Sequence, residues 1–268
     1  MVDADQYIKN LEAAHLLREP VIKEAIRQLQ LTPGSCGLDV GCGIGLYTLL
    51  LAEEVGPAGK VTGLDTDPRL IEYAERLAVE SGLTERLSFI NGDAAELPFA
   101  DNTFAWAGSM DCIGYMPHEP VPLLRELARV VKPGGTVFLL IWSSQKLLPG
   151  YPMLEARLNA TPSGIAPFDQ TMNPEDHFMR ALGWFRQAGL MEPIARTFVR
   201  DIIPPLDLGT LKALTELLQM RWGGAGAEVA REDWMTYRRL VDPASPEIIL
   251  NPLDYYAFFT YSLFCGRC

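Results

Sequence analysis

Three glycines and an aspartate follow an apolar run near residue 40 and could form a ligand-binding loop. The segment Leu38-Asp-Val-Gly-Cys-Gly-Ile-Gly45 places Asp39 before Gly41, Gly43 and Gly45. Glycine lets the backbone adopt positive φ angles and approach a ligand closely. A helix that follows such a loop also offers its unpaired N–H groups to the ligand. The segment therefore predicts a strand that ends in a nucleotide-binding type of loop.

Two classes of cofactor could occupy this loop. The dinucleotide motif G-x-G-x-x-G, started at Gly41, requires a glycine where this chain has Leu46. The Asp39 carboxylate would also repel a pyrophosphate, whereas it would attract a cationic amino group or a sulfonium. S-adenosylmethionine carries both of these cations. The loop therefore favours S-adenosylmethionine, with NAD as the alternative.

Two further carboxylates follow the next two expected strands. Val61–Asp65 is typical of a short strand, and Asp65 at its end could accept hydrogen bonds from the ribose hydroxyls of either cofactor. A third strand is expected at Leu87–Ile90, and Asp93 in the turn after it could accept a hydrogen bond from an adenine amine. Both side chains could instead be loop carboxylates or helix N-caps. Their order and spacing together favour a cofactor site.

The later elements complete an alternation of strands and helices. A fourth strand is expected at 104–110, then an amphipathic helix, then a Lys132–Gly135 turn that leads into a fifth strand at 137–142. Over residues 36–143 this order resembles the class I S-adenosylmethionine-dependent methyltransferases. It is most similar to the type 11 group, which includes the ubiquinone and menaquinone C-methyltransferases. The resemblance implies an α/β fold with a Rossmann-like sheet of seven strands, the last one antiparallel.

The resemblance also assigns residues to parts of the cofactor and implies S-adenosylhomocysteine as the product. It implies that the methionine part contacts Asp39, Gly41, Gly43 and Gly45, and that the ribose contacts Asp65. The adenine would contact Thr66, Asp67, Asp93 and Ala94, and the sulfonium would lie near Ser109 and Met110. One departure is visible, because many relatives have Phe-Asp where this chain has Phe104-Ala105. That change leaves the assigned cofactor residues intact.

Catalytic residues are harder to assign. Methyl transfer from a sulfonium is a displacement with an activated leaving group, so alignment and exclusion of water can supply much of the rate. If the acceptor atom carries a proton, His118 and Tyr115, just after the fourth strand, are the candidate catalytic residues. The alternative interpretation makes His118 an exposed helix start, Tyr115 a pocket wall and Asp111 a turn residue.

We expect a single methyltransferase domain, residues 1–268, made of four parts. These are an N-terminal helical cap (1–35), a Rossmann-like core (36–203), a helical lid insertion (204–252) and a final strand (253–268). Within them the apolar patterns predict helices at 5–17 and 20–30, a helix that begins at Asn173-Pro174, and strands at 193–203 and 255–264.

The segment 204–252 is longer than the connection that the class I pattern needs. Asp207 can cap a first helix, and Gly223–Gly226 separates it from a second helix expected around residues 228–240. The segment could be a helical hairpin packed on the sheet or a lid over the acceptor. Its aromatic and apolar side chains suit both: Trp222, Trp234, Met235 and Tyr237.

Composition narrows the choice of acceptor. A formal charge of −11 disfavours nucleic acid as the substrate, and 48% apolar content suffices for a buried sheet. No run approaches the roughly 18 apolar residues of a membrane span. Five cysteines without regular spacing suit the cytoplasm. We therefore expect methylation of an O, N or C atom of a small, partly apolar molecule by a cytoplasmic monomer or homodimer.

Three alternatives to this function stay open. The Cys265-x-x-Cys268 spacing could bind a metalloid together with a further cysteine, as in arsenite methyltransferases, although Cys42 belongs to the glycine loop and no metal is expected. The chain could be a catalytically silent S-adenosylmethionine-binding module that acts through a partner protein. It could also be an NAD-dependent oxidoreductase, which Leu46 and Asp39 disfavour.

Overall fold

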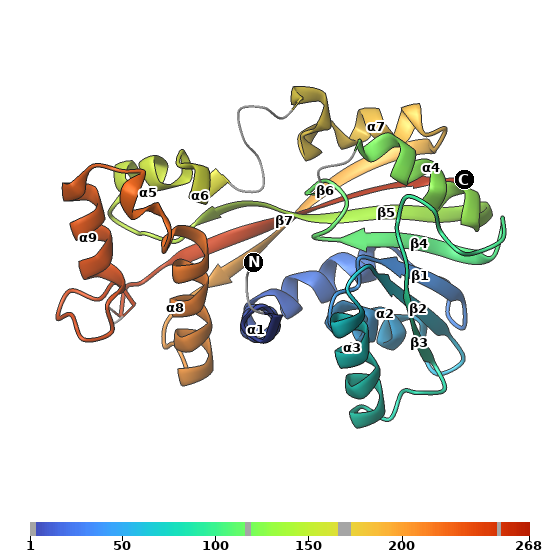
Figure 1. The fold of residues 1–268 in the computed structure, drawn as a ribbon, viewed down its shortest axis with the longest axis horizontal. Helices are drawn as coiled ribbons and strands as arrows, with labels where there is room; N and C mark the ends of the chain where they lie inside the picture. Colours follow the sequence, from blue (N-terminus) through green and yellow to red (C-terminus); the bar gives the residue numbers. More distant parts are fainter. Residues whose placement is uncertain (1–3, 116–118, 166–172, 251–252) are drawn as a thin grey trace. The chain divides into compact units, whose positions relative to one another are not determined.

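The computed structural model describes residues 4–115, 119–165, 173–250 and 253–268, and Figure 1 shows their fold. Packing divides the chain into two units. Unit 1 comprises residues 1–20, 143–172 and 199–260, and unit 2 comprises residues 21–142, 173–198 and 261–268.

Seven strands form one sheet in the order β3-β2-β1-β4-β5-β7-β6. Their bounds are β1 Cys36–Val40, β2 Lys60–Asp65, β3 Leu87–Asn91, β4 Phe104–Met110, β5 Val131–Lys146, β6 Met191–Ile202 and β7 Ala257–Arg267. The pairs β1–β2, β1–β4, β2–β3 and β4–β5 are parallel.

The last strand, β7, runs antiparallel to β5. Gly134 near the start of β5 bonds with Cys268, whereas Ser143 further along β5 bonds with Thr260. Residue numbers therefore rise along one strand as they fall along the other. This sheet confirms the predicted Rossmann-like class I fold, with seven strands and an antiparallel last strand.

Helices of unit 2 flank the parallel strands. They are α2 Leu46–Val55, α3 Pro68–Glu80, α4 Pro120–Val130, the 3-10 turns η1 Pro174–Asp176 and η2 Phe178–Arg180, α7 Ala181–Gln187, and the end of α1, Ala4–Gln28. The predicted amphipathic helix is α4, which buries Leu123, Leu124, Leu127 and Val130. The apolar run 137–141 of β5 is buried throughout, as expected for a strand with helices on both faces.

Two predicted helices differ from the structure. The chain forms one continuous helix, α1, with Pro20 inside it, where the sequence predicted a break between residues 17 and 20. Leu17 and Val21 on either side of the proline are both buried, so the apolar face continues across it and packing outweighs the hydrogen bond that proline cannot donate. The segment expected to be helical from Asn173 instead begins with two 3-10 turns before α7.

Unit 1 contains most of the predicted lid segment together with two helices that precede it in sequence. Its elements are α5 Pro152–Asn159, α6 Pro162–Ile165, α8 Leu208–Trp222, η3 Ala225–Ala227, α9 Arg231–Val241 and the start of α1. Asp207 caps α8 by accepting a hydrogen bond of 2.7 Å from the Thr210 N–H, as predicted. Gly223 follows α8 directly, so the predicted break between the two helices is also present.

Aromatic side chains bind the helices of unit 1 to one another. Trp222 is fully buried, and its indole N–H donates to the Asn159 amide oxygen at 3.2 Å. Tyr237 is also fully buried, and its hydroxyl donates to the Leu218 carbonyl at 2.7 Å. Met235, by contrast, is 61% exposed. These contacts pack the helices α8 and α9 on each other and on α5.

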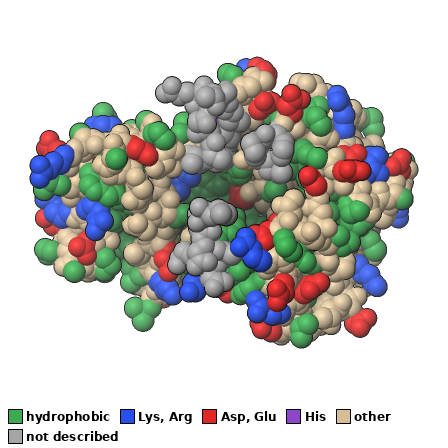
Figure 2. Space-filling model, viewed as in Figure 1, with side chains coloured by type: hydrophobic (Ala, Val, Ile, Leu, Met, Phe, Trp, Pro, Cys, Tyr) green, Lys and Arg blue, Asp and Glu red, His purple; other side chains and the backbone are tan. Residues whose placement is uncertain are grey.

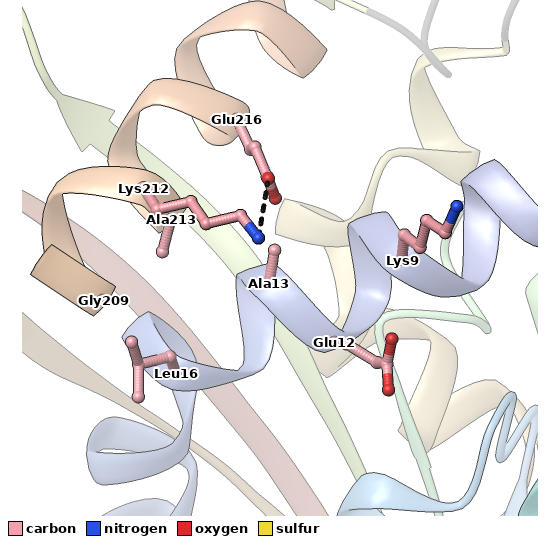
Figure 3. Close-up of a pocket in the computed structure, with 8 residues that line it drawn as sticks. All are labelled: Lys9, Glu12, Ala13, Leu16, Gly209, Lys212, Ala213 and Glu216. Carbon is pink, nitrogen blue, oxygen red and sulfur yellow. Dashed lines mark ion pairs between the residues drawn. The ribbon is translucent and has the colours of Figure 1, made fainter.

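A cavity of about 600 Å³ opens in unit 1 between α1 and α8 (Figure 3). Its lining combines small apolar residues with charged ones: Lys9, Glu12, Ala13, Leu16, Gly209, Lys212, Ala213 and Glu216. The Lys212 ammonium faces the Glu216 carboxylate at 3.9 Å, as the dashed line shows. The cavity wall therefore comes from both the predicted cap and the predicted lid.

Charged side chains of both signs lie side by side on the face shown in Figure 2. Over the described residues of that face, Lys and Arg are interspersed with Asp and Glu and form no continuous basic surface of the kind that binds phosphate backbones. None of the helices in the described part of the chain combines the length and apolar character that a membrane crossing requires.

Candidate active site

The strand order reverses between β1 and β4. From β1 the chain continues to β2 and β3 on one side, and then returns to β4 and β5 on the other. Ligands of open α/β sheets bind at the carboxyl ends of the strands at such a reversal. Asp39 of β1 pairs with Gly108 of β4, so these two strands end side by side. All the predicted cofactor residues belong to unit 2 and follow or end strands β1 to β4.

The glycine loop after β1 requires its glycines for two separate reasons. Gly41, Gly43 and Gly45 have φ angles of 75°, 54° and 81°, a region that residues with a Cβ adopt only at a cost. A Cβ on Gly41 would also lie 2.2 Å from the Cys112 Sγ. Because Gly45 is the N-cap of α2, no side chain caps the N–H groups of the first helical turn. Such groups suit a polar or anionic part of a ligand.

Asp65 connects this loop to the turn after β2. One carboxylate oxygen accepts the Gly43 N–H at 2.9 Å, and the other accepts the Asp67 N–H at 3.0 Å. A carboxylate oxygen can accept about two hydrogen bonds, so these contacts are compatible with a bond to a ribose hydroxyl. The Asn91 amide donates to the carbonyls of Asp65 and Thr66 and fixes the same turn. Sequence reasoning missed Asn91, which lies at the end of β3.

Asp39 is buried next to the loop, with 1% of its surface exposed. Its carboxylate accepts a hydrogen bond of 2.7 Å from the Thr48 hydroxyl on α2. Burial raises the pKa of Asp39 to about 7, against the opposing effect of the Thr48 hydrogen bond and with a smaller contribution from the charge of Asp65. A carboxyl group with such a pKa loses its proton more easily when a cation binds nearby. Its interaction with the cationic groups of a cofactor stays a prediction.

The residues assigned to the adenine lie at the ends of β2 and β3. Thr66 and Asp93 are exposed, whereas Ala94 is buried. Asp67 is the N-cap of α3 and accepts a hydrogen bond from the Arg69 N–H, and the Arg69 side chain lowers the pKa of Asp67. Asp93 accepts the Ala95 N–H at 2.9 Å. Both carboxylates therefore organise turns in the structure, and their contacts with adenine stay predictions.

The end of β4 is buried beside the glycine loop. Ser109 and Met110 are both buried, and the Ser109 hydroxyl accepts the Ile113 N–H at 3.1 Å. This bond fixes the turn in which Cys112 packs against Gly41. Burial, with smaller effects from neighbouring carboxylates, raises the pKa of Cys112 to about 12, and burial also raises the pKa of the Cys42 thiol. Neutral thiols of this kind are weak nucleophiles and weak metal ligands.

Cysteine-based metal binding therefore has little structural support. Within the described ranges, no three side chains of His, Cys, Asp or Glu are grouped so that they could hold a metal ion. Burial raises the pKa of both Cys265 and Cys268 as well.

The structure describes only one of the two candidate catalytic residues. His118 lies outside the described residues. Tyr115 is half-buried, donates its hydroxyl proton to the Trp142 carbonyl on β5, and lies near the Phe178 ring. Its hydroxyl therefore positions the turn after β4, and a proton-transfer role for it stays a prediction.

The sequence places Asp111 in the same loop as Tyr115 and His118, with a turn residue as the alternative, and could not predict its long-range contacts. Its carboxylate accepts the Trp142 N–H at 2.8 Å and the Tyr261 hydroxyl at 2.5 Å. Tyr261 lies on β7, 150 residues further along the chain. No local spacing could have predicted that pair.

The segment that contains the glycine loop is similar to known methyltransferases. Residues 38–135 match the methyltransferase domain family. A demethylmenaquinone methyltransferase from Bacillus cereus is 38% identical over 126 residues, which make up 47% of this chain and 52% of the relative. The segment 38–135 therefore resembles a methyltransferase domain. It spans about half the length of the curated relatives it matches, including a demethylmenaquinone methyltransferase from Listeria monocytogenes that is 36% identical over 129 residues.

Solved structures share the fold of the methyltransferase domain and of the remaining chain. An S-adenosylmethionine-dependent methyltransferase from Aquifex aeolicus aligns with a TM-score of 0.52 at 18% identity, over 98% of this chain and 99% of that one. A cyclase aligns with a TM-score of 0.52 at 22% identity, over 95% of this chain and 79% of that one. At these identities the likeness shows a common fold, and this fold serves more than one reaction.

The matched segment has a structural boundary. Residues 38–135 contain the glycine loop and every residue assigned to the cofactor, and they lie entirely within unit 2. Unit 1 lies wholly outside the match. The family match therefore covers the residues assigned to the cofactor and does not cover the elements of unit 1.

Proposed function

We propose that this protein is an S-adenosylmethionine-dependent methyltransferase that transfers a methyl group to an O, N or C atom of a small, partly apolar acceptor. One observation carries the proposal. The glycine loop after β1 is bonded through the Gly43 N–H to the Asp65 carboxylate, at the point where the sheet order reverses and inside the segment that matches methyltransferases. The loop, the acidic residue and the strand ends thus converge on one place.

The residues of this site fit the chemical groups of S-adenosylmethionine. Glycines at positive φ allow the backbone to approach the methionine part, Asp65 offers carboxylate oxygens to the ribose, and the buried Asp39 supplies negative potential for the amino group and sulfonium. When bound, the cofactor supplies an electrophilic methyl group on a positively charged sulfur. The chain then has to orient the acceptor and exclude water.

The acceptor we favour is a reduced quinone or a similar hydroxylated aromatic ring. The names of the curated relatives support this choice, because they describe demethylmenaquinone methyltransferases. Unit 1, however, lies outside the matched segment, so this chain can present a different surface to the acceptor. We further propose that α8 and α9 act as the lid that selects the acceptor, and that the protein works in the cytoplasm as a monomer or homodimer without nucleic acid.

Dinucleotide chemistry fits the sheet less well. Dinucleotide-binding sheets have the order 3-2-1-4-5-6 with parallel strands, whereas here the antiparallel β7 lies between β5 and β6. The shared fold of a cyclase makes a reaction other than methyl transfer the second candidate, and binding of S-adenosylmethionine without methyl transfer belongs to the same class.

A transfer assay tests the proposal. The full chain is incubated with S-adenosylmethionine labelled in its methyl group and with 1,4-dihydroxynaphthalene as the probe acceptor, and the product is identified by mass spectrometry. We expect a labelled product whose formation falls with Asp65→Ala. If a panel of phenolic, amine and carbon acceptors yields no labelled product from a protein that binds S-adenosylmethionine, the second candidate is correct.

A further inference from the structure

The chain turns sharply at Asp111, directly after β4. Asp111 has a φ of 50°, a conformation that is costly for a residue other than glycine and is held only where the surroundings determine it. Its backbone N–H donates to the Leu140 carbonyl at 2.9 Å. Its carboxylate is held from two other strands, by the Trp142 N–H of β5 at 2.8 Å and by the Tyr261 hydroxyl of β7 at 2.5 Å. Two strands, β5 and β7, therefore hold this carboxylate directly after a third, β4.

The partners of Asp111 are themselves rigid. Tyr261 is fully buried, and its ring meets the Trp142 ring edge-on with centroids 5.7 Å apart. The Tyr115 hydroxyl donates to the carbonyl of the same Trp142, so the turn and β5 are bonded on both sides of that residue. A side chain that is locked in this way keeps its orientation when a ligand binds.

The Asp111 carboxylate belongs to a turn that packs against the glycine loop. The next residue, Cys112, packs so closely on Gly41 that a Cβ there would lie 2.2 Å from its Sγ. Asp111 therefore stands one residue away from a direct contact with the loop that would hold the methionine part of the cofactor. It is also half-buried, so it is neither a fully enclosed structural carboxylate nor a freely solvated one.

We propose that Asp111 is the group that takes the proton of the methyl acceptor, and that Tyr261 and the Trp142 N–H hold it in place. This inference rests on the proposed function and adds a catalytic residue to it. A carboxylate oxygen can accept more than one hydrogen bond, so the bonds from the Trp142 N–H and the Tyr261 hydroxyl are compatible with a bond from an acceptor hydroxyl.

The step balances as a displacement with proton transfer. The bond from sulfur to the methyl carbon breaks, and its electron pair stays on sulfur, which becomes a neutral thioether. A new bond forms between the methyl carbon and the nucleophilic oxygen or ring carbon of the acceptor. The acceptor proton passes to a carboxylate oxygen of Asp111 and from there to water after the products leave. No oxidant, reductant or metal ion is required.

The first test replaces Asp111 by its nearly isosteric amide. Asp111→Asn keeps a group that can accept the Trp142 N–H and removes the charge and the basicity. We expect kcat for 1,4-dihydroxynaphthalene to fall by at least about 100-fold, the usual size of a general-base contribution, while the Kd for S-adenosylhomocysteine changes by less than about threefold. Asp101→Asn, at an exposed carboxylate before β4, is the matched control and should keep the activity of the parent. A folded Asp111→Asn protein with parental kcat overturns the proposal.

The second test separates proton transfer from a structural effect. Tyr261→Phe removes one hydroxyl from a buried ring, and we expect kcat to fall about tenfold with little change in KM for the acceptor. For both variants the loss of kcat relative to the parent should be smaller with a ring-fluorinated dihydroxynaphthalene, because its more acidic hydroxyl depends less on a base. If Asp111→Asn does not fold, Tyr261→Phe decides alone. A deficit in kcat that is equal for both acceptors, or no deficit, overturns the proposal, whereas a parent protein that methylates none of the phenolic, amine and carbon acceptors contradicts the proposed function instead.

Discussion

Two aspartates of the site have opposite surroundings although both stand at the end of a strand. Asp65 is half-buried and accepts hydrogen bonds from two backbone N–H groups. Asp39 is enclosed and has one hydroxyl partner, so burial raises its pKa to about 7. The first therefore suits a fixed hydrogen-bond acceptor, and the second suits a group that responds to a cation.

Asp65→Ala should lower the affinity for S-adenosylmethionine at least tenfold. The substitution removes the proposed ribose acceptor, where each charge-assisted hydrogen bond contributes about 1.5 to 3 kcal/mol. It also leaves the Gly43 N–H without its partner, so the loop loses one of its supports. Calorimetric titration measures the change. Asp101→Asn, at an exposed carboxylate outside the assigned cofactor residues, is the control, and a folded Asp65→Ala protein with unchanged affinity would refute the assignment.

Asp39→Asn should make the protein more stable at neutral pH and weaken its binding of S-adenosylmethionine. Because the folded-state pKa of Asp39 is raised from 3.8 to about 7, the folded protein retains this proton while the unfolded chain loses it. The contribution of Asp39 to the free energy of unfolding is therefore complete below about pH 4. It falls by at most about 4 kcal/mol as the pH rises to about 7.

Urea unfolding of the parent and of Asp39→Asn at several pH values tests this sign. The difference in free energy of unfolding should grow in favour of the asparagine variant between pH 4 and pH 7 and stay constant above. Glu80→Gln, an exposed position on α3, serves as the control and should show no such trend. A difference that is independent of pH would show that Asp39 is ionised throughout.

At the scale of elements, the glycine loop joins β1 to α2 and brings backbone N–H groups to the strand ends. Gly43→Val should abolish binding of S-adenosylmethionine in a protein that stays folded, because Val combines a β-branched side chain with a φ of 54°. Calorimetry and thermal unfolding measure the two effects separately.

Gly82→Val provides the matched control for that substitution. Gly82 also has a positive φ, 67°, and an added Cβ there would meet no atom within 4 Å. It therefore carries a similar backbone cost away from the site. We expect both variants to lose similar stability and only Gly43→Val to lose binding. Equal binding by both would show that the loop is a plain connection.

The sequence predicted those elements whose signals are local. The alternation of apolar runs and the glycine loop predicted β1 to β5 and their helices, and Asp207 predicted the start of α8. The predicted break before Pro20 was wrong, because the apolar face that stays buried on both sides of Pro20 outweighs the preference of proline for a helix start. The pair Asp111–Tyr261 joins residues 150 positions apart, so only the antiparallel return of β7 brings it together.

At the scale of the molecule, the two units differ in what they share with relatives. The segment that matches methyltransferases lies within unit 2, whereas the predicted lid, 204–252, belongs to unit 1 and buries Trp222 and Tyr237. The proposed lid therefore belongs to the part of the chain that the family match does not cover.

Replacing residues 204–252 by a short Gly-Ser linker should retain binding of S-adenosylmethionine and abolish methyl transfer, because an open site loses alignment and admits water. Binding and transfer are measured on the same preparation. Normal transfer by the shortened chain would exclude a lid role. Loss of folding would favour the packing role that buried Trp222 and Tyr237 already show.

The most direct measurement of the central claim is calorimetric titration of the full chain with S-adenosylmethionine, S-adenosylhomocysteine and NAD in parallel. The account predicts saturable binding of the first two ligands, weakened by Asp65→Ala, and no binding of NAD. Saturable binding of NAD, together with no binding of S-adenosylmethionine, would contradict it.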